Sequence, residues 1–390
     1  MYKINKKYFL TYLQPIIEKG IVTTIKKEKV KEYKLGKHYF YEITDEKIRY
    51  IHEWLNKSFQ KNIDLNNSSI AYRKGYSYLN LFEPHRHNYY FLRLDIKSFF
   101  HSIQMSDIIA VFEPYFDNEH IDEKKKQKLI DGFINLVTFK IPVSFKNKEF
   151  KSSRILPIGF ITSPVISNII FRKIDLLIQK FCSEKNIIYT RYSDDMLFSS
   201  SNNSKYLHSE DFYKEISIFL NIMNFKLNQN KTLYATHTLS LNGYTLQYSN
   251  QPNSKNEQLI NEFRLSNKKL LIIKKMIYLI NKQEKSPKFI LNKLFNFGIN
   301  KLSTKYPIES KNVKEKYYYD QLLNKLTGYR SYVLSIVVFD KKHDCCQDKT
   351  IDKYTDIVED LNKIIKRYIK KIETISKKIE DEIKESESAK

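Results

Sequence analysis

Residues 187–199 have the sequence IIYTRYSDDMLFS, in which two adjacent carboxylates, Asp194 and Asp195, stand between two runs of β-branched and aromatic residues. Such runs favour half-buried strands, and the polar Ser-Asp-Asp between them favours a tight turn. We therefore predict a β-hairpin with both carboxylates at its tip. Two explanations fit this pair: Asp is an ordinary turn residue, and paired carboxylates on a rigid hairpin can bind a divalent cation.

The composition indicates a folded and strongly basic protein. The chain has 390 residues, of which 42% are hydrophobic, so it can bury a sizeable core and divide into two or three domains. Its 67 basic and 44 acidic residues give a formal net charge of +23, which favours a polyanionic partner, nucleic acid first. The abundance of Lys, Asn, Ile and Tyr is also typical of an AT-rich coding bias, so the charge is supporting evidence only.

The sequence lacks the marks of a secreted or membrane protein. Cys182, Cys345 and Cys346 form neither a CxxC pair nor a disulfide framework, which fits a reducing compartment and argues against structural zinc. Residues 1–13 lack the apolar run of a signal peptide, and no apolar stretch reaches about 18 residues. We predict a soluble, cytoplasmic protein with no membrane partner.

A third carboxylate, Asp95, ends a nearly continuous apolar run within residues 89–103. An Asp at the end of a buried strand is unfavourable unless it is paired or binds a metal. The alternative is that Asp95 caps a helix that starts near Ser98.

A Pro-Gly turn at residues 157–159 leads into a predicted helix, with Thr162 or Ser163 as its cap and Pro164 in its first turn. The chain contains only eight glycines, so Gly159 suggests a backbone requirement such as a positive φ or close approach to a ligand.

Elsewhere we predict a basic hairpin that turns at Gly36, a helix at residues 48–59 and helical structure across residues 107–140. Arg73 and Lys74 precede Gly75, an arrangement that can present both cations to a phosphate.

The C-terminal part has its own pattern. Asn242-Gly243 is a strong hairpin signal, residues 247–257 are a candidate domain boundary, and helical patterns dominate to the end. From residue 351 apolar side chains recur at three- and four-residue steps, which predicts a long basic amphipathic helix. It either packs on its own domain or forms a coiled coil with another subunit.

Taken in their order along the chain, these motifs resemble those of a reverse transcriptase. Asp95 with Phe99-Phe100 matches the first catalytic motif, residues 156–159 (LPIG) with Ser163-Pro164 the second, and residues 192–195 (YSDD) the third. The similarity continues through Lys231 and Gly243 to residues 328–331, so it covers about residues 25–335. Each motif alone is weak, but the ordered set is specific.

The resemblance implies an α+β right-hand polymerase fold and an RNA-directed DNA polymerase that uses dNTPs. Its implied divisions are fingers at 1–90, a palm at 91–250 with finger insertions at about 105–155, a helical thumb at 251–345 and a C-terminal amphipathic helix at 346–390.

The resemblance also assigns residues. The implied ligands of two Mg²⁺ ions, with Mn²⁺ as an alternative, are Asp95, Ile96, Asp194 and Asp195, of which Asp195 is the looser ligand. Lys231 is implied as a proton donor to pyrophosphate, although a loop lysine is more often only solvated. The implied nucleotide-binding residues are Arg73, Lys74, Phe99, Phe100 and Gly159, and the implied primer grip is Asn242 and Gly243. A bulky Phe100 would clash with a ribose 2′-hydroxyl and favour deoxynucleotides.

Within the family the motifs look most like those of retron and defence-associated bacterial enzymes. Ile158 stands where the second motif usually carries Gln, and the Asn-Ala-x-x-His and Val-Thr-Gly signatures typical of retron enzymes are absent. We therefore expect an antiviral reverse transcriptase that copies a dedicated noncoding RNA into DNA through an RNA/DNA duplex, with a second defence protein or a homo-oligomer as further partners. The alternatives are a retron enzyme making branched RNA-linked DNA, a template-independent or protein-primed polymerase, and an RNA-binding or assembly module with dispensable catalysis.

Overall fold

The computed structural model describes residues 3–36, 38–202, 204–248, 261–297 and 310–388. The chain forms two compact units, Met1–Thr236 and His237–Lys390. Most of the predicted boundary at 247–257 lies outside the described residues, and the division into units falls earlier, between residues 236 and 237.

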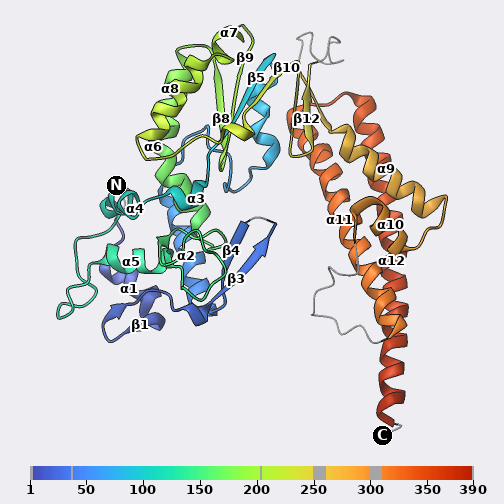
Figure 1. Ribbon diagram of the computed structural model, residues 1–390, viewed down its shortest axis with the longest axis horizontal. Coiled ribbons are helices and arrows are strands. Elements are labelled where there is room, and N and C mark those ends of the chain that lie inside the picture. Colours follow the sequence, from blue (N-terminus) through green and yellow to red (C-terminus); the bar gives the residue numbers. More distant parts are fainter. Residues whose placement is uncertain (1–2, 37, 203, 249–260, 298–309, 389–390) are drawn as a thin grey trace. The chain divides into compact units, whose positions relative to one another are not determined.

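A four-stranded sheet organises the first unit (Figure 1). Its strands lie in the order β10 (Leu233–Thr236), β5 (Tyr90–Asp95), β9 (Asp195–Ser200) and β8 (Ile188–Tyr192), and every neighbouring pair is antiparallel. The hairpin predicted at residues 187–199 is confirmed, with Ser193 and Asp194 as its turn. Asp95 closes β5 and does not cap the following helix, whose N-cap position is Ser98.

Two long helices pack beside this sheet. They are α6 (Ser163–Ser183) and α8 (Glu210–Asn221), and their apolar faces bury Ile174 and Phe212 in the same core cluster as Phe198 of β9. The register of the sheet is held by this burial, because a slip of one residue would turn the apolar side chains of each strand to the opposite face.

The start of α6 differs from the prediction. Neither Thr162 nor Ser163 caps the helix with its side chain. The Thr162 hydroxyl forms a hydrogen bond with Nδ1 of His52 (3.0 Å), and the Ser163 hydroxyl donates to the carbonyl of Pro157 (2.7 Å). Both hydroxyls therefore fix the preceding loop to its surroundings. Pro164 lies in the first turn as predicted.

The N-terminal region contains the predicted basic hairpin, made of β3 (Val30–Leu35) and β4 (His38–Ile43), and the predicted helix around Trp54, α2 (Glu46–Asn62). The prediction of helix across 107–140 is wrong for residues 116–128, and also for residues 139–140, which form a strand. A helix ends at Phe112, and Pro114 in the 3-10 turn that follows cannot continue an α-helical hydrogen-bond ladder.

The remaining elements of the first unit are short. Its other helices are α1 (Lys6–Leu13), α3 (Phe99–Ser102), α4 (Met105–Phe112), α5 (Leu129–Val137) and α7 (Ser204–Leu207). Its two-residue strands pair as β1 (Ile17–Glu18) with β2 (Ile21–Val22) and β6 (Phe139–Lys140) with β7 (Arg154–Ile155).

In the part that the structure describes, the second unit combines a small sheet with four helices. The sheet orders β11 (Thr238–Leu241), β12 (Tyr244–Gln247) and β13 (Glu262–Leu265), and the helices are α9 (Asn267–Asn281), α10 (Pro287–Phe295), α11 (Lys311–His343) and α12 (Asp348–Ser388). The Asn-Gly hairpin is confirmed, whereas β13 was missed by the expectation of helix after residue 251.

The predicted C-terminal amphipathic helix is confirmed as α12, which packs along α11 within its own unit. Its buried residues include Tyr354, Leu361 and Ile364. None of the described helices combines the length and the apolar character that a membrane crossing requires.

Candidate active site

The register of the sheet brings the three predicted carboxylates to one end. Asp95 of β5 lies directly opposite Asp195 of β9, and the amide of Ile96 donates to the carbonyl of Asp194 in the adjoining turn (2.9 Å). Burial raises the pKa of Asp194, and the charges of Asp195 and Asp95 raise it further. Burial also raises the pKa of Asp195, although the guanidinium of Arg93 lowers it in part.

Polar side chains surround Asp95, whose side chain is only 2% exposed. The Lys231 ammonium donates to Oδ2 (2.9 Å), and the Asn228 amide donates to Oδ1 (3.1 Å). The structure thus places Lys231, which the resemblance implied as a proton donor to pyrophosphate, against Asp95. Asn228 was not predicted, because it reaches Asp95 only through a contact distant in sequence.

Arg93 is a second unpredicted member of the site. Its Nε donates to Oδ1 of Asp195 (2.9 Å), its Nη2 contacts both Asp195 and Asp95, and its Nη1 donates to the carbonyl of Lys231 (3.2 Å). The sequence contained a usable signal, since residues two apart in a strand share a face and Arg93 precedes Asp95 by two.

The donor chemistry of this group fits divalent metal ions, because carboxylate oxygens are the hard ligands that Mg²⁺ prefers. A metal bound here would compete with the cationic groups of Lys231 and Arg93 for the same oxygens. Among the described residues, the cluster whose ligand atoms all lie within 4.8 Å of one another is instead Asp340 with Cys345 and Cys346.

A buried ion pair fixes the turn that carries Asp194, and this pair was not predicted from the sequence. Arg191 and Asp175 are both fully buried, with Nη2 and Oδ2 2.7 Å apart. Arg191 also donates to the carbonyl of Ser193 through Nη1 (2.8 Å), and the Tyr189 hydroxyl donates to Asp175 (2.8 Å). The guanidinium therefore holds the backbone of the hairpin turn in place.

The loop with the predicted phosphate-binding cations lies beside this turn. The amide of Ile70 donates to the carbonyl of Arg191 (2.8 Å), and the Tyr72 hydroxyl donates to Ser193 (3.1 Å). Arg73 donates to backbone carbonyls of its own loop, including that of Ser69 (3.1 Å), and its guanidinium stacks over the ring of Tyr76 at 4.6 Å. Lys74 is exposed.

The two predicted phenylalanines have different environments. Phe99 is buried and packs against Phe171 and Phe225, each with its ring centroid 5.6 Å away, so it belongs to the core. Phe100 is half-buried and packs on Phe99, with 5.4 Å between the ring centroids. Of the two, Phe100 is therefore the one with surface left for a nucleotide.

Gly159 has a φ of +106°, as its predicted backbone requirement demands, and a Cβ there would lie 2.6 Å from the carbonyl oxygen of Tyr41. The backbone that Gly159 approaches closely is therefore that of β4.

The predicted primer grip belongs to the second unit. Asn242 and Gly243 form the turn of the β11–β12 hairpin, both with positive φ, and the Tyr332 hydroxyl donates to the carbonyl of Asn242.

Comparisons with known proteins identify the family to which this sequence is similar. Residues 25–290 match the family described as reverse transcriptase (RNA-dependent DNA polymerase). The Retron Ec73 reverse transcriptase of Escherichia coli is 28% identical over 206 residues, covering 50% of this chain and 61% of the relative. The Retron Ec86 reverse transcriptase of the same organism is 27% identical over 165 residues, covering 42% and 45% respectively. This chain therefore spans less than two thirds of the length of these relatives.

A solved structure of telomerase from Candida albicans, in complex with a TWJ fragment of telomeric RNA, is also similar. It is 11% identical, with a TM-score of 0.42, and the alignment covers 96% of this chain and 68% of the telomerase chain.

Proposed function

The chain belongs to the family of reverse transcriptases (RNA-dependent DNA polymerases), and on this premise we propose that it synthesises DNA from dNTPs on an RNA template. The observation that carries the proposal is the pairing of Asp95 with Asp195 across β5 and β9, with Asp194 in the adjoining turn. Three carboxylates on adjacent strands of one sheet suit nucleotidyl transfer, in which negative charge must be neutralised at the reacting phosphate.

The carboxylates of Asp95 and Asp194 would hold the divalent ions, with Asp195 as the looser ligand and the Ile96 position beside them. Two Mg²⁺ ions, or Mn²⁺, would when bound lower the pKa of the primer 3′-hydroxyl and stabilise the leaving pyrophosphate. Lys231 would give a proton to pyrophosphate, since its ammonium already lies at the carboxylates.

Other residues of the chain would bind and select the substrates. Arg73 and Lys74 would bind the triphosphate by charge-assisted hydrogen bonds, and Gly159 would let its loop approach the nucleotide and the template. Phe100 would exclude a 2′-hydroxyl sterically. The hairpin at Asn242 and Gly243 would hold the primer strand. The helices that follow it would hold the RNA/DNA duplex through contacts with its phosphates.

We propose that the template is a dedicated noncoding RNA and that the DNA product serves antiviral defence in the cytoplasm. A second defence protein and a homo-oligomer formed through α12 are proposed partners. The similarity to two retron reverse transcriptases favours one further candidate, a retron enzyme whose DNA product is branched from its RNA.

The test is to sequence the nucleic acids that copurify with the protein made in cells with its native flanking DNA. The same is done for the variant Asp194→Ala with Asp195→Ala. One noncoding RNA in both samples, with complementary DNA only beside the unmodified protein, is the expected result.

The other outcomes separate the alternatives. DNA attached to RNA through a 2′-hydroxyl would identify the retron reaction. DNA without complementary RNA would instead indicate template-independent or protein-primed synthesis. RNA with no DNA under any condition would refute the catalytic assignment and leave an RNA-binding module.

A further inference from the structure

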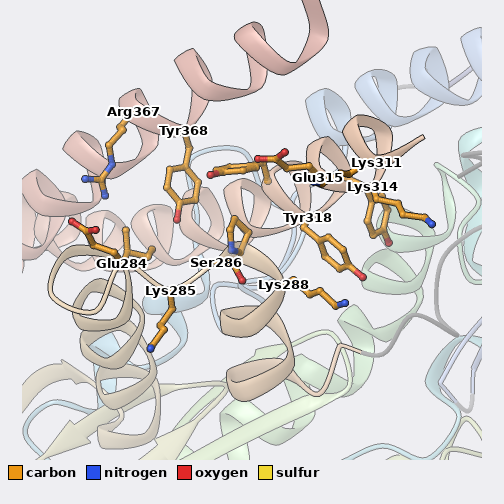
Figure 2. A pocket seen from close by; sticks show the side chains of 14 residues that line it. Glu284, Lys285, Ser286, Lys288, Lys311, Lys314, Glu315, Tyr318, Arg367 and Tyr368 are labelled. Atoms are coloured by element: carbon orange, nitrogen blue, oxygen red, sulfur yellow. The ribbon is translucent and has the colours of Figure 1, made fainter. Parts of the chain in front are cut away.

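A large hollow lies within the second unit, away from the turn of the Asn-Gly hairpin. It is bounded by the connection between α9 and α10, the start of α11 and the middle of α12, and its volume is about 1020 Å³. Figure 2 shows Arg367 and Tyr368 reaching into it from α12, with Ser286 and Lys288 on the opposite side. Ligand pockets usually measure about 300–1,000 Å³, so this one suits an extended ligand more than a small metabolite.

The described lining of the hollow is strongly cationic. Its charged members are five cations (Lys285, Lys288, Lys311, Lys314 and Arg367) and two acids (Glu284 and Glu315). The ion pairs found in the described part of the chain include none of these five cations. Arg367 donates to Oδ1 of Asn281 (3.1 Å), whereas the four lysines have no acidic partner at ion-pair distance among the described residues and can meet an anionic ligand.

Tyrosine rings form the wall between these cations. Tyr319 and Tyr368 meet edge to face with ring centroids 5.1 Å apart, which fixes both rings, and Tyr368 is buried. Tyr318 is half-buried, and the Lys288 ammonium lies 5.9 Å from the centroid of its ring. A half-buried ring held beside a cation offers a face on which a flat aromatic ligand can stack.

We propose that this hollow binds unpaired nucleotides, with a base stacked on Tyr318 or Tyr319 and the adjoining phosphates held by Lys288, Lys311 and Lys314. Proteins bind single-stranded nucleic acids with aromatic rings that stack on the bases and with cations that contact the phosphates, and the hollow contains both. The bases of a duplex are already stacked on one another and cannot stack on these rings. The inference goes beyond the proposed polymerase function, on which it rests only in that the protein must encounter nucleic acid.

The first test measures the binding of a fluorescein-labelled oligouridylate of about 12 nucleotides, a length within the usual site sizes, by fluorescence anisotropy over a range of salt concentrations. The full-length protein is compared with a charge variant, Lys288→Glu with Lys311→Glu and Lys314→Glu. Each phosphate contact contributes about 0.7 to the slope of log K against log salt for a single strand, so the slope should fall by about 2.

A matched control separates a built site from general basicity. Lys274→Glu with Lys275→Glu and Lys353→Glu makes the same charge change at exposed positions of the same unit that do not line the hollow. The control should retain nearly the full slope. An equal loss in both variants would overturn the proposal.

The second test removes the rings. Tyr318→Leu with Tyr319→Leu should weaken binding at least about five-fold, and Phe at both positions should restore it, because stacking needs the ring and not the hydroxyl. Thermal melting verifies that each variant folds. If the charge variant weakens binding and the Leu variant does not, the hollow holds phosphate or an acidic peptide without reading a base, and the proposal is wrong.

Competition with UMP identifies the source of the nucleotide. Displacement of the oligomer by UMP at similar concentrations indicates a free nucleotide site, and its failure indicates a site for a strand; either result is compatible with the shared chemistry. Primer extension on an oligo(dT)-primed poly(rA) template by the unmodified protein tests the polymerase function separately, so the failure of one inference is distinguishable from the failure of the other.

Discussion

The buried ion pair between Arg191 and Asp175 gives the sharpest test of how the candidate site is held. In Asp175→Asn the guanidinium would lose its counter-ion while remaining fully buried. Burial alone would lower the pKa of Arg191, but the neighbouring Asp175 more than offsets this effect and the pKa of Arg191 is raised, so the guanidinium is charged in the folded protein. The variant would therefore leave an uncompensated charge in the core.

The expected loss is large. Two hydrogen bonds join the pair, Nε to Oδ1 at 2.9 Å and Nη2 to Oδ2 at 2.7 Å, and Asn can retain only part of them. Removing one partner of a buried pair destabilises proteins by about 3–5 kcal/mol, against a total free energy of unfolding of about 5–15 kcal/mol. DNA synthesis should fall as well, because Arg191 holds the carbonyl of Ser193 beside Asp194.

The assay is urea denaturation followed by tryptophan fluorescence. Trp54 is the only tryptophan of the chain and lies in α2, so its signal reports the first unit alone. Lys214→Ala, which removes an exposed ion pair with Glu210 on α8, is a matched control with an expected change below about 0.5 kcal/mol.

A double variant tests the reasoning itself. Arg191→Met with Asp175→Leu removes both charges and should recover much of the stability that Asp175→Asn loses, because apolar replacement of a whole buried pair is often close to neutral. A loss below about 1 kcal/mol for Asp175→Asn, or a double variant as unstable as the single one, would refute the argument from uncompensated charge.

Four further predictions concern separate parts of the first unit. Burial lowers the pKa of His85 to about 3, so the unfolded chain binds a proton that the folded unit does not; the contribution of His85 to stability should be complete above the ordinary pKa of 6.5 and fall as the pH drops, by about 2 kcal/mol at pH 5. Burial also lowers the pKa of His52 and of His101, so urea melts should show a larger total loss between pH 7 and pH 5, of which His85→Gln should remove about 2 kcal/mol. Gly159→Ala should lower the urea midpoint by the equivalent of about 1–3 kcal/mol, because its φ of +106° and the nearby Tyr41 carbonyl leave no room for a Cβ; an unchanged midpoint would contradict the assigned geometry. Phe100→Ala should increase ribonucleotide incorporation relative to deoxynucleotides in primer extension, and unchanged selectivity would remove Phe100 as the sugar gate. Asp95→Asn should abolish primer extension while template binding, measured by anisotropy, persists; retained extension would exclude Asp95 as a metal ligand.

Local signals predicted much of the first unit. The β-branched and aromatic runs on either side of Asp194 specify the β8–β9 hairpin, and in the second unit Asn242-Gly243 likewise specifies the β11–β12 hairpin, since each pattern acts within about ten residues. The family match supports the right-hand polymerase fold. The roles of the individual site residues remain predictions, as do the finger, palm and thumb boundaries.

What the sequence did not reveal depends on contacts distant along the chain. Asn228 meets Asp95 only because β5 and the segment before β10 become neighbours, and no local pattern marks such an encounter. Thr162 is a good helix cap by type, yet His52 offers its hydroxyl a buried partner. Similarly, β13 becomes a strand because it pairs with β12, which overrides its weak local preference.

The contact between β4 and the loop at Gly159 has a mechanical consequence. The amide of Tyr41 donates to the carbonyl of Ile158 (2.8 Å), and the buried Tyr41 hydroxyl accepts from Asn147 (2.9 Å). This link ties the β3–β4 hairpin to the loop that precedes α6. A displacement of the hairpin should therefore move that loop as well. Because the link runs through backbone atoms, the side chain at position 158 can vary without separating the hairpin from the loop. A side chain at position 159 would displace both the loop and β4, since its Cβ would meet the Tyr41 carbonyl.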